Sequence, residues 1–547
     1  LRRQSSLPLT WTAPDDNGVD VTGYQVRYAR VPITSANFDD TTVTTAMTYS
    51  NTPAPHGTMD GILVPGLTIE TGYYFAVLAT DLVGTRSPII ATQTAAAAHF
   101  KTFVLSGIGT GHTVDSGDFG GTVGATFTND TLSDLVVGSR PNNIVQIYLA
   151  DATNGYTTPS VTITFPSSTG SIMTAINAGD FDDDMKDDIA VSSLAENKIW
   201  IFSRKNRVGA SWPATMMDTD ASYTLTIDPA SPFFGKLATR PLARAGNFDA
   251  APGEDLAIGF STLASAGGNK GAELIIKGSS AFPATLTIPE AVPTRTIEID
   301  GPMVAGNSGF GANAIGIGQF FPAPSGSTLV VGATSIGSAF AYAGNATLIE
   351  KVTQAMNLDY SRTIGFVGRV GNSAGVLSIA SAIGQYTEIH RGTAATGPFE
   401  ENAGMGSTAS LTLTGSSANS FGAINIGGGI RGTSSSVTFI GDGLPDLVLA
   451  GQTEAGVQNA GPVYIVSGVA LRDRSGSVAV ADGSLYTGLH PDFVKIIGQV
   501  PPPGGATWGG YAQGCVVPDL NGDNFGDFAV SEGTTTAGVT TRIVVFY

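Results

Sequence analysis

The densest cluster of ionisable side chains lies in the segment GDFDDDMKDDIAV, residues 179 to 191. Six aspartates fall within nine positions there, and an apolar run follows at once. Neighbouring carboxylates repel one another and raise one another's pKa, so a folded loop of this composition needs a source of positive charge. The alternative is a solvated acidic turn, because Asp is a common turn residue.

Alternate positions of this loop carry groups that suit a hard cation. The predicted ligands are the carboxylates of Asp180, Asp182, Asp184 and Asp188 and the backbone carbonyl of Lys186. Ca²⁺ accepts roughly 6–8 oxygen ligands with tolerant geometry, whereas Mg²⁺ demands octahedral order and keeps its waters. No His or Cys lies nearby to indicate zinc. We therefore predict calcium, with Asp183 and Asp187 outside the ligand set and facing solvent.

A second complete loop, DLNGDNFGD, repeats the pattern near the end of the chain. Its predicted ligands are Asp519, Asn521, Asp523, the carbonyl of Phe525, and Asp527. Two complete copies in the same phase of a repeat favour calcium over a solvated turn. Three further loops keep part of the set, and they are expected to hold up to three more ions: Asn247, Asp249 and Asp255; Asp118 and Asp134; Asp442 and Asp446.

These loops recur within a longer repeat. Each unit has a strand of small residues, a polar loop and an apolar strand, as in INAGDFDDDMKDDIAVSS and RAGNFDAAPGEDLAIGFS. A third strand such as NKIWIFS follows, and then a fourth such as VTITF, YTLTI, RTIEI or RTIGF. Seven such units predict four-stranded sheets, the blades of a seven-bladed β-propeller. The last unit lacks a fourth strand, so residues 102–106 are predicted to pair with residues 543–547 and close the ring.

The dipeptides Phe310-Gly311 and Phe421-Gly422, together with the Asp loops, resemble the FG-GAP repeats of integrin α-subunit propellers and their bacterial relatives. The resemblance covers residues 101–547. It implies that the D-x-D-x-D-x-x-x-D loop joins two strands of a blade and binds calcium. It is specific in architecture and unspecific in biological role.

The first part of the chain carries a different pattern. The segments LPLTWTAPDDNG, GYQVRY and GLTIETGYYFAV read as strands separated by turns, and they resemble a fibronectin type III domain over residues 6–94. The resemblance implies an immunoglobulin-like β-sandwich with Trp11 in its core and Tyr73 at its tyrosine corner. We thus predict an all-β chain: a fibronectin type III-like domain at 1–94 with its first strand incomplete, a linker at 95–100, and the propeller at 101–547.

Composition narrows the class of partner. The chain carries 45 acidic against 27 basic residues, a formal net charge of −18, which repels nucleic acid and anionic membranes and attracts cations. No apolar run is long enough to span a membrane. The single cysteine, Cys515, reads as a small core residue, and none of the five histidines lies in a nucleophile motif. We expect no nucleic-acid partner, no transmembrane segment and no enzymatic activity.

The expected function is that of an extracellular or cell-surface calcium-binding module for binding, adhesion or surface assembly, with a protein or glycan ligand. The alternatives that stay open are a carbohydrate-binding lectin, a non-catalytic part of a larger secreted polysaccharide- or lipid-degrading enzyme, and an enzyme of that kind whose propeller carries the active site. Because the chain begins at Leu1 instead of Met, we expect it to be a processed or trimmed product. Neither the ligand nor the oligomeric state follows from the sequence.

Overall fold

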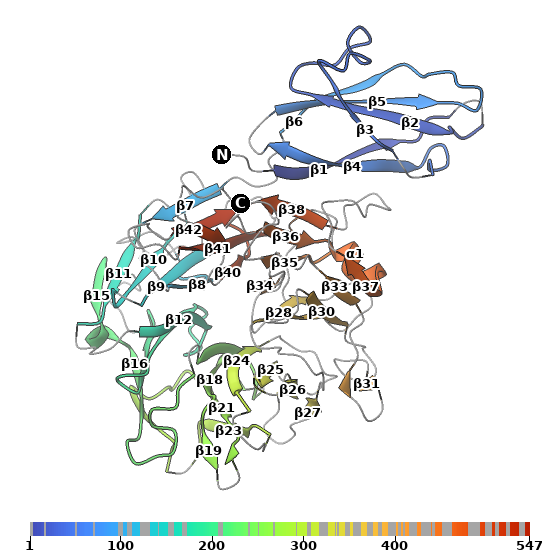
Figure 1. Cartoon of the computed structure of the whole chain (residues 1–547). Helices are drawn as coiled ribbons and strands as arrows, with labels where there is room; N and C mark the ends of the chain where they lie inside the picture. The colour runs from blue at the N-terminus through green and yellow to red at the C-terminus, as the bar shows by residue number, and fades with distance from the viewer. Residues whose placement is uncertain are drawn as a thin grey trace.

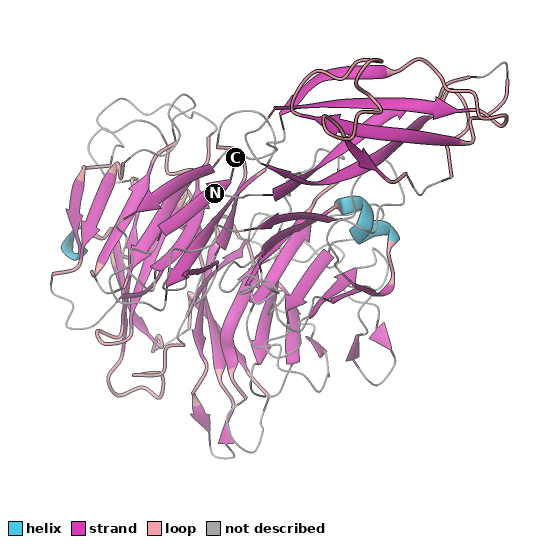
Figure 2. Ribbon diagram, turned by 45° about the horizontal axis from the view of Figure 1, so that its top comes forward, coloured by secondary structure: helices cyan, strands magenta, loops and turns pink. Residues whose placement is uncertain are grey.

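The chain is all-β in a computed structural model, where the described residues include one short helix, α1 (Gly468–Asp473), a 3-10 turn at Asp218–Asp220 and a 3-10 residue at Ser335. The structure describes residues 4–15, 18–49, 52–68, 72–96, 102–106, 112–120, 132–140, 142–150, 158–166, 172–205, 212–238, 241–249, 251–265, 268–291, 293–302, 308–316, 327–333, 335, 338–344, 351–353, 363–368, 376–380, 386–391, 401–402, 406–407, 411–414, 424–427, 439, 444–450, 462–479, 493–497, 506–508, 514–520, 526–534 and 542–546. Within those ranges no helix has the length and apolar character that a membrane crossing requires. Figures 1 and 2 show a small group of strands beside a larger assembly of sheets.

The first group of strands forms a two-layer sandwich. In one sheet β1 (Gln4–Thr12) runs antiparallel to β4 (Met59–Thr68). The other sheet has the order β3 (Thr45–Met47), β2 (Gly23–Ala29), β5 (Gly72–Thr80), β6 (Ile90–Ala96). Trp11 is buried in the core with its ring centroid 4.9 Å from that of Tyr24, and the buried Tyr73 accepts a hydrogen bond from Arg30 through its hydroxyl at 3.4 Å.

Seven sheets, each with a set of four antiparallel strands, account for most strands of the described part of the chain after the sandwich, and we number them sheet 1 to sheet 7. Sheets 1 to 3 are β8 (His112–Gly117), β9 (Asp134–Ser139), β10 (Ile144–Tyr148), β11 (Val161–Thr164); β12 (Ile172–Gly179), β13 (Asp188–Ser193), β14 (Lys198–Phe202), β16 (Tyr223–Ile227); and β17 (Leu242–Gly246), β18 (Asp255–Phe260), β21 (Ala272–Ile276), β23 (Thr296–Asp300). Sheets 4 and 5 are β24 (Phe310–Gly316), β25 (Thr328–Ala333), β26 (Ser338–Ala343), β27 (Lys351–Thr353); and β28 (Thr363–Gly368), β29 (Val376–Ala380), β30 (Tyr386–Arg391), β33 (Leu411–Thr414). Sheets 6 and 7 are β34 (Ile424–Gly427), β35 (Leu447–Ala450), β36 (Pro462–Val466), β38 (Phe493–Ile497); and β40 (Gly514–Val517), β41 (Asp527–Thr534), β42 (Arg542–Phe546), β7 (Thr102–Ser106).

The second strand of these sheets is covered on both faces. Every residue of β9, β13, β18 and β25 is buried, and their sequences are DLVVGS, DIAVSS, DLAIGF and TLVVGA. The fourth strand differs, because β11 and β16 alternate buried aliphatic residues with half-exposed threonines. In sheets 1 to 4 a largely apolar, fully buried strand therefore marks the interior, and in sheets 1 and 2 an alternating strand marks the outer part.

The first strands of the sheets lie against one another in cyclic order. β8 contacts β12, and the series continues through β17, β24, β28, β34 and β40, which returns to β8. The hydrophobic cores lie between consecutive sheets: Val517 and Ala529 of sheet 7, for example, pack with Val114 and Leu135 of sheet 1. Figure 1 shows the sheets following one another in chain order around this set of inner strands.

The strand after the sandwich completes the last sheet. β7 runs antiparallel to β42, with Thr102 opposite Phe546 and Ser106 opposite Arg542. The partner segment thus begins one residue before the predicted 543–547, and Tyr547 lies outside the described residues. The pairing brings together strands that are more than four hundred residues apart in the sequence.

Three sheets receive an additional strand from the chain segment of a neighbouring sheet. β15 (Thr215–Met217), which precedes the last strand of sheet 2, lies parallel to β11 of sheet 1. In the same way β22 (Thr285–Ile288) lies beside β16, and β37 (Gly476–Ala479) beside β33. Smaller pairings are those of β19 (Ala264–Ser265) with β20 (Gly268–Asn269), β31 (Glu401–Asn402) with β32 (Gly406–Ser407), and β39 (Ala506–Trp508) with β41.

One strand assignment from the sequence was wrong. The segment RTIGF, expected as the fourth strand of its unit, lies largely in β28, the first strand of sheet 5. The fourth strand of sheet 4 is instead the short β27. A short apolar alternation fits either place, because the pattern reports burial of alternate residues and carries no information about position within a sheet.

A buried carboxylic acid interrupts the aliphatic core between sheets 3 and 4. Glu273 in β21 is 0% exposed, and neither carboxylate oxygen has a hydrogen-bond partner within the described residues. It lies opposite Gly259, at the register position that the buried Ile199 occupies opposite Ser192 in sheet 2. Burial raises the pKa of the Glu273 carboxyl well above its ordinary value of 4.5, so the folded protein keeps this group protonated to a higher pH than the unfolded chain does.

Stability is therefore expected to fall as the pH rises through and above about 4.5, since the unfolded chain ionises Glu273 while the folded chain does not. The variant Glu273→Gln is neutral and of similar size, so its free energy of unfolding should match that of the parent near pH 4.5. Above that pH it should exceed the parent's by up to about 1.4 kcal/mol for each pH unit. Urea unfolding of both proteins from pH 4.5 to pH 8 measures the difference. A constant gap between the two proteins would contradict a protonated, buried Glu273.

Candidate metal centre

The Asp-rich segment forms the hairpin loop between β12, which ends at Gly179, and β13, which begins at Asp188. Two residues of this loop adopt left-handed backbone angles, Asp183 with φ +57° and Met185 with φ +66°. Such angles are uncommon outside glycine and persist where surrounding contacts enforce them. One such contact is the Met185 N–H, which donates to Asp180 Oδ2 at 2.7 Å.

Three carboxylates converge in this loop. Asp180, Asp182 and Asp184 each offer one oxygen, and these oxygens all lie within 4.8 Å of one another. The Asp182 side chain is 0% exposed, and its Oδ2 accepts hydrogen bonds from the hydroxyls of Ser203 at 2.6 Å and Tyr223 at 2.8 Å. Its Oδ1 is buried without a hydrogen-bond partner among the described residues. A buried anionic oxygen of this kind is costly unless a cation or donor meets it.

The other two carboxylates hold the loop while keeping lone pairs for a ligand. Asp180 accepts the N–H groups of Asp184 and Met185 at 2.7 Å, and Asp184 Oδ1 accepts the N–H of Lys186 at 2.9 Å. Each carboxylate offers about four lone-pair sites, so these bonds leave room for a metal. Burial, followed by the charges of Asp182 and Asp180, raises the pKa of Asp184 to about 6. A divalent cation would relieve this repulsion.

The last aspartate of the loop is a structural acceptor. Asp188 is buried, and its Oδ2 accepts the N–H groups of Phe181 at 3.0 Å and Asp182 at 3.2 Å. The same bond recurs in four other sheets, from Phe119 to Asp134, Phe248 to Asp255, Phe439 to Asp446 and Leu520 to Asp527. In three of these the second carboxylate oxygen accepts an N–H that follows the third strand, from Ala150, Gly278 and Gly468. The sequence signal that we missed is a buried apolar residue seven positions before the aspartate in sheets 2, 3, 6 and 7; in sheet 1 the spacing is fifteen.

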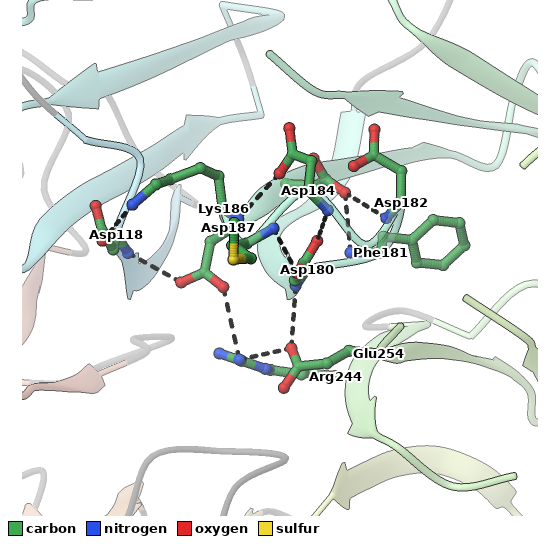
Figure 3. A network of polar contacts seen from close by, with 11 residues as sticks. Asp118, Asp180, Phe181, Asp182, Asp184, Lys186, Asp187, Arg244 and Glu254 are labelled. Carbon is green, nitrogen blue, oxygen red and sulfur yellow. Dashed lines mark hydrogen bonds and ion pairs between the residues drawn. The ribbon is translucent and has the colours of Figure 1, made fainter. Parts of the chain in front are cut away.

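A network of ion pairs ties this loop to the sheets on both sides (Figure 3). On one side Lys186 Nζ lies 3.0 Å from Asp118 Oδ2 of sheet 1. On the other side Arg244 of sheet 3 lies 3.5 Å from Asp187 Oδ1 and 2.6 Å from Glu254 Oε2, while the Asp180 N–H donates to Glu254 Oε2. The prediction that Asp187 faces solvent was wrong: its side chain is 16% exposed and paired. Asp183 is exposed, as predicted.

The incomplete loops have other partners for their acidic groups. Asp118 pairs with Lys186, and Asp134 accepts the backbone N–H groups of Phe119 and Ala150. In the loop of sheet 3, Asp249 Oδ1 accepts the Ala251 N–H at 2.8 Å, its Oδ2 lies 3.7 Å from Lys277 Nζ, and Asn247 donates to the Ala251 carbonyl. Asp442 lies outside the described residues.

The second complete loop is described at its two ends. The Asp519 carbonyl accepts the N–H of Ser133 in sheet 1 at 2.9 Å, and Asp527 Oδ2 accepts the Leu520 N–H at 2.6 Å. Asn521, Asp523 and Phe525 lie outside the described residues. Its metal ligands therefore stay a prediction.

Comparison with known proteins does not assign the chain to a family. No family model matches the chain, and no curated protein matches it. Among solved structures, a protein from Lactobacillus plantarum matches 71% of this chain and 97% of its own length at 10% identity and a TM-score of 0.31. The core factor of S. cerevisiae matches 82% of this chain and 61% of its own length at 9% identity and a TM-score of 0.32. At these TM-scores neither likeness informs the fold or the site.

Replacement of the structural aspartate of sheet 3 should destabilise the protein with or without metal. Asp255→Ala strands the N–H groups of Phe248, Asp249 and Gly278, all of which Asp255 accepts. At about 1 kcal/mol per lost hydrogen bond, we expect a loss of roughly 3 kcal/mol in the free energy of unfolding. Denaturant unfolding in excess calcium and in excess chelator measures it. A loss confined to the calcium sample would contradict this role.

Proposed function

We propose that the seven sheets are the blades of a β-propeller of the FG-GAP type, preceded by a fibronectin type III-like sandwich. The cyclic contacts of the first strands from β8 to β40 and the cores between consecutive sheets support this proposal. So does the pairing of β7 with β42, which removes the free edge that each strand would otherwise expose.

We propose further that the loop of sheet 2 binds Ca²⁺. The single observation that carries this proposal is the buried Asp182 Oδ1, which lacks a partner among the described residues although its loop gathers three carboxylate oxygens within 4.8 Å. Asp180, Asp182 and Asp184 would hold the ion, with the Lys186 carbonyl and Asp188 as further predicted ligands. An all-oxygen set favours a hard cation, and a loop that joins two strands accommodates the flexible coordination of calcium more readily than the octahedral demand of magnesium.

The bound ion would have a structural role. Asp180 and Asp187 connect the loop to sheet 3, and Lys186 connects it to sheet 1. Neutralising the loop therefore stabilises two interfaces between sheets, and metal affinity appears as folding stability. On this rigid frame we propose a non-enzymatic module of the cell surface or extracellular space that binds a protein or glycan ligand; its loops supply the contact surface.

Calcium should raise the melting temperature of the chelator-treated chain, and Asp182→Asn should reduce the rise by the share that the sheet 2 loop contributes. This substitution removes the charge of the buried central carboxylate. Asp183→Asn is the matched control, since Asp183 is exposed in the same loop and loses the same charge. Scanning calorimetry of the three proteins with calcium and with chelator compares them. Equal calcium responses in all three would refute a site built on Asp182.

A closed ring should unfold as one unit. Leu105 of β7 is 4% exposed, lies opposite Ile543 and packs in the core between sheets 7 and 1. Leu105→Ala is expected to cost about 2–5 kcal/mol and to lower the midpoint of a single transition that includes the buried Trp200 of sheet 2. Trp200 fluorescence, followed after replacement of the other three tryptophans by Phe, reports on that sheet. An unchanged Trp200 transition would indicate that the sheets unfold independently.

A further inference from the structure

The hairpin loops of sheets 2 and 3 are built on the same frame. In each loop the last aspartate, Asp188 or Asp255, accepts the N–H groups of the residues seven and six positions before it. The neighbouring third strand then ends at Phe202 opposite Ile189, and at Ile276 opposite Leu256. The next residue along that strand faces the loop, and it is Ser203 in sheet 2 and Lys277 in sheet 3.

The two loops differ in what meets their central carboxylate. Asp182 and Asp249 hold equivalent positions, six residues before the last aspartate. Asp182 receives hydrogen bonds from two neutral hydroxyls, and its Oδ1 has no partner within the described residues. Asp249, whose side chain is 7% exposed, has the Lys277 ammonium 3.7 Å from its Oδ2.

The other ligand positions also carry less negative charge in the sheet 3 loop than in the sheet 2 loop. The third carboxylate of the sheet 2 loop, Asp184, corresponds to Ala251, and the first, Asp180, corresponds to the neutral Asn247. At its ligand positions the sheet 3 loop thus carries two fewer acidic groups, and its central carboxylate gains an ammonium in place of a hydroxyl. A single ammonium near a partly buried carboxylate satisfies this smaller charge, whereas the sheet 2 loop needs a divalent ion.

We propose that Lys277 is a built-in cation that stands in the sheet 3 loop where the metal stands in the sheet 2 loop. The sheet 3 loop therefore excludes metal, and the residue that follows the third strand selects between the two states: a serine admits a divalent ion and a lysine replaces it. This inference rests on the proposed calcium site of sheet 2. On this proposal Asn247, Asp249 and Asp255 hold no calcium, in contrast to the prediction from the sequence.

The first test transfers the lysine to the sheet 2 loop. Isothermal titration of the full-length, calcium-stripped chain with calcium chloride counts the ions bound per chain. Ser203→Lys should bind one ion fewer than the parent and should melt at a higher temperature than the parent in chelator. Ser203→Ala is the matched control, since it removes the hydroxyl without adding a charge, and it should keep the parent's number of ions.

The reciprocal test removes the lysine from the sheet 3 loop. Lys277→Ser combined with Ala251→Asp should bind one ion more than the parent, whereas Lys277→Arg with Ala251→Asp should bind none in addition. These two double variants test whether Lys277 excludes the metal even if Ser203→Lys does not fold. An unchanged ion count in both Ser203→Lys and the Lys277→Ser double variant overturns the inference. A parent chain that binds no calcium overturns the calcium site itself, which is a separate outcome.

Discussion

A buried carboxylate that accepts backbone N–H groups fixes the geometry of each aspartate-bearing hairpin. In sheet 2 this group is Asp188, which holds the N–H groups of Phe181 and Asp182 while the Phe181 ring packs against Phe282 with a centroid distance of 4.5 Å. The bond and the buried ring together set the depth at which the loop enters the core. Whatever charge the outer part of the loop carries, its backbone is already placed by these contacts.

The state of the outer part of each loop then depends on whether nearby cations offset its carboxylates. The loop of sheet 2 has more carboxylates than its neighbours can offset, and burial raises the pKa values of Asp180, Asp184 and Asp188. At the outer part of the loop Arg244 pairs with Asp187, and Lys186 of the loop pairs with Asp118 of sheet 1. The Lys205 ammonium donates to the Asp182 carbonyl. The buried face of Asp182 receives hydroxyl donors, and the metal proposal follows from that difference between the outer part and the centre of the loop.

The sequence predicts the strands well and their contacts across sheets poorly. Apolar alternation identified β11 and β16, and the spacing of Asp180, Asp182 and Asp184 identified the residues that the structure brings together. It could not show that Asp188 and Asp255 have backbone partners, because an aspartate bound to N–H groups and one bound to a metal look alike in a motif. Nor could it pair Asp187 with Arg244 or Asp249 with Lys277, since those partners are brought together by sheet stacking and strand pairing.

The parallel strands that cross between neighbouring sheets have a consequence for synthesis of the chain. The outer edge of sheet 1 is covered by β15, which lies more than fifty residues beyond β11. Most of sheet 2 must therefore be synthesised before the outer edge of sheet 1 is paired. In the same way, the outer edge of sheet 2 is paired only after β22 of the sheet 3 segment has been made. The last step waits for the final strand, because β42 is the partner of β7. Incomplete chains therefore expose unpaired strand edges until late in synthesis, and they are prone to wrong association for that whole period.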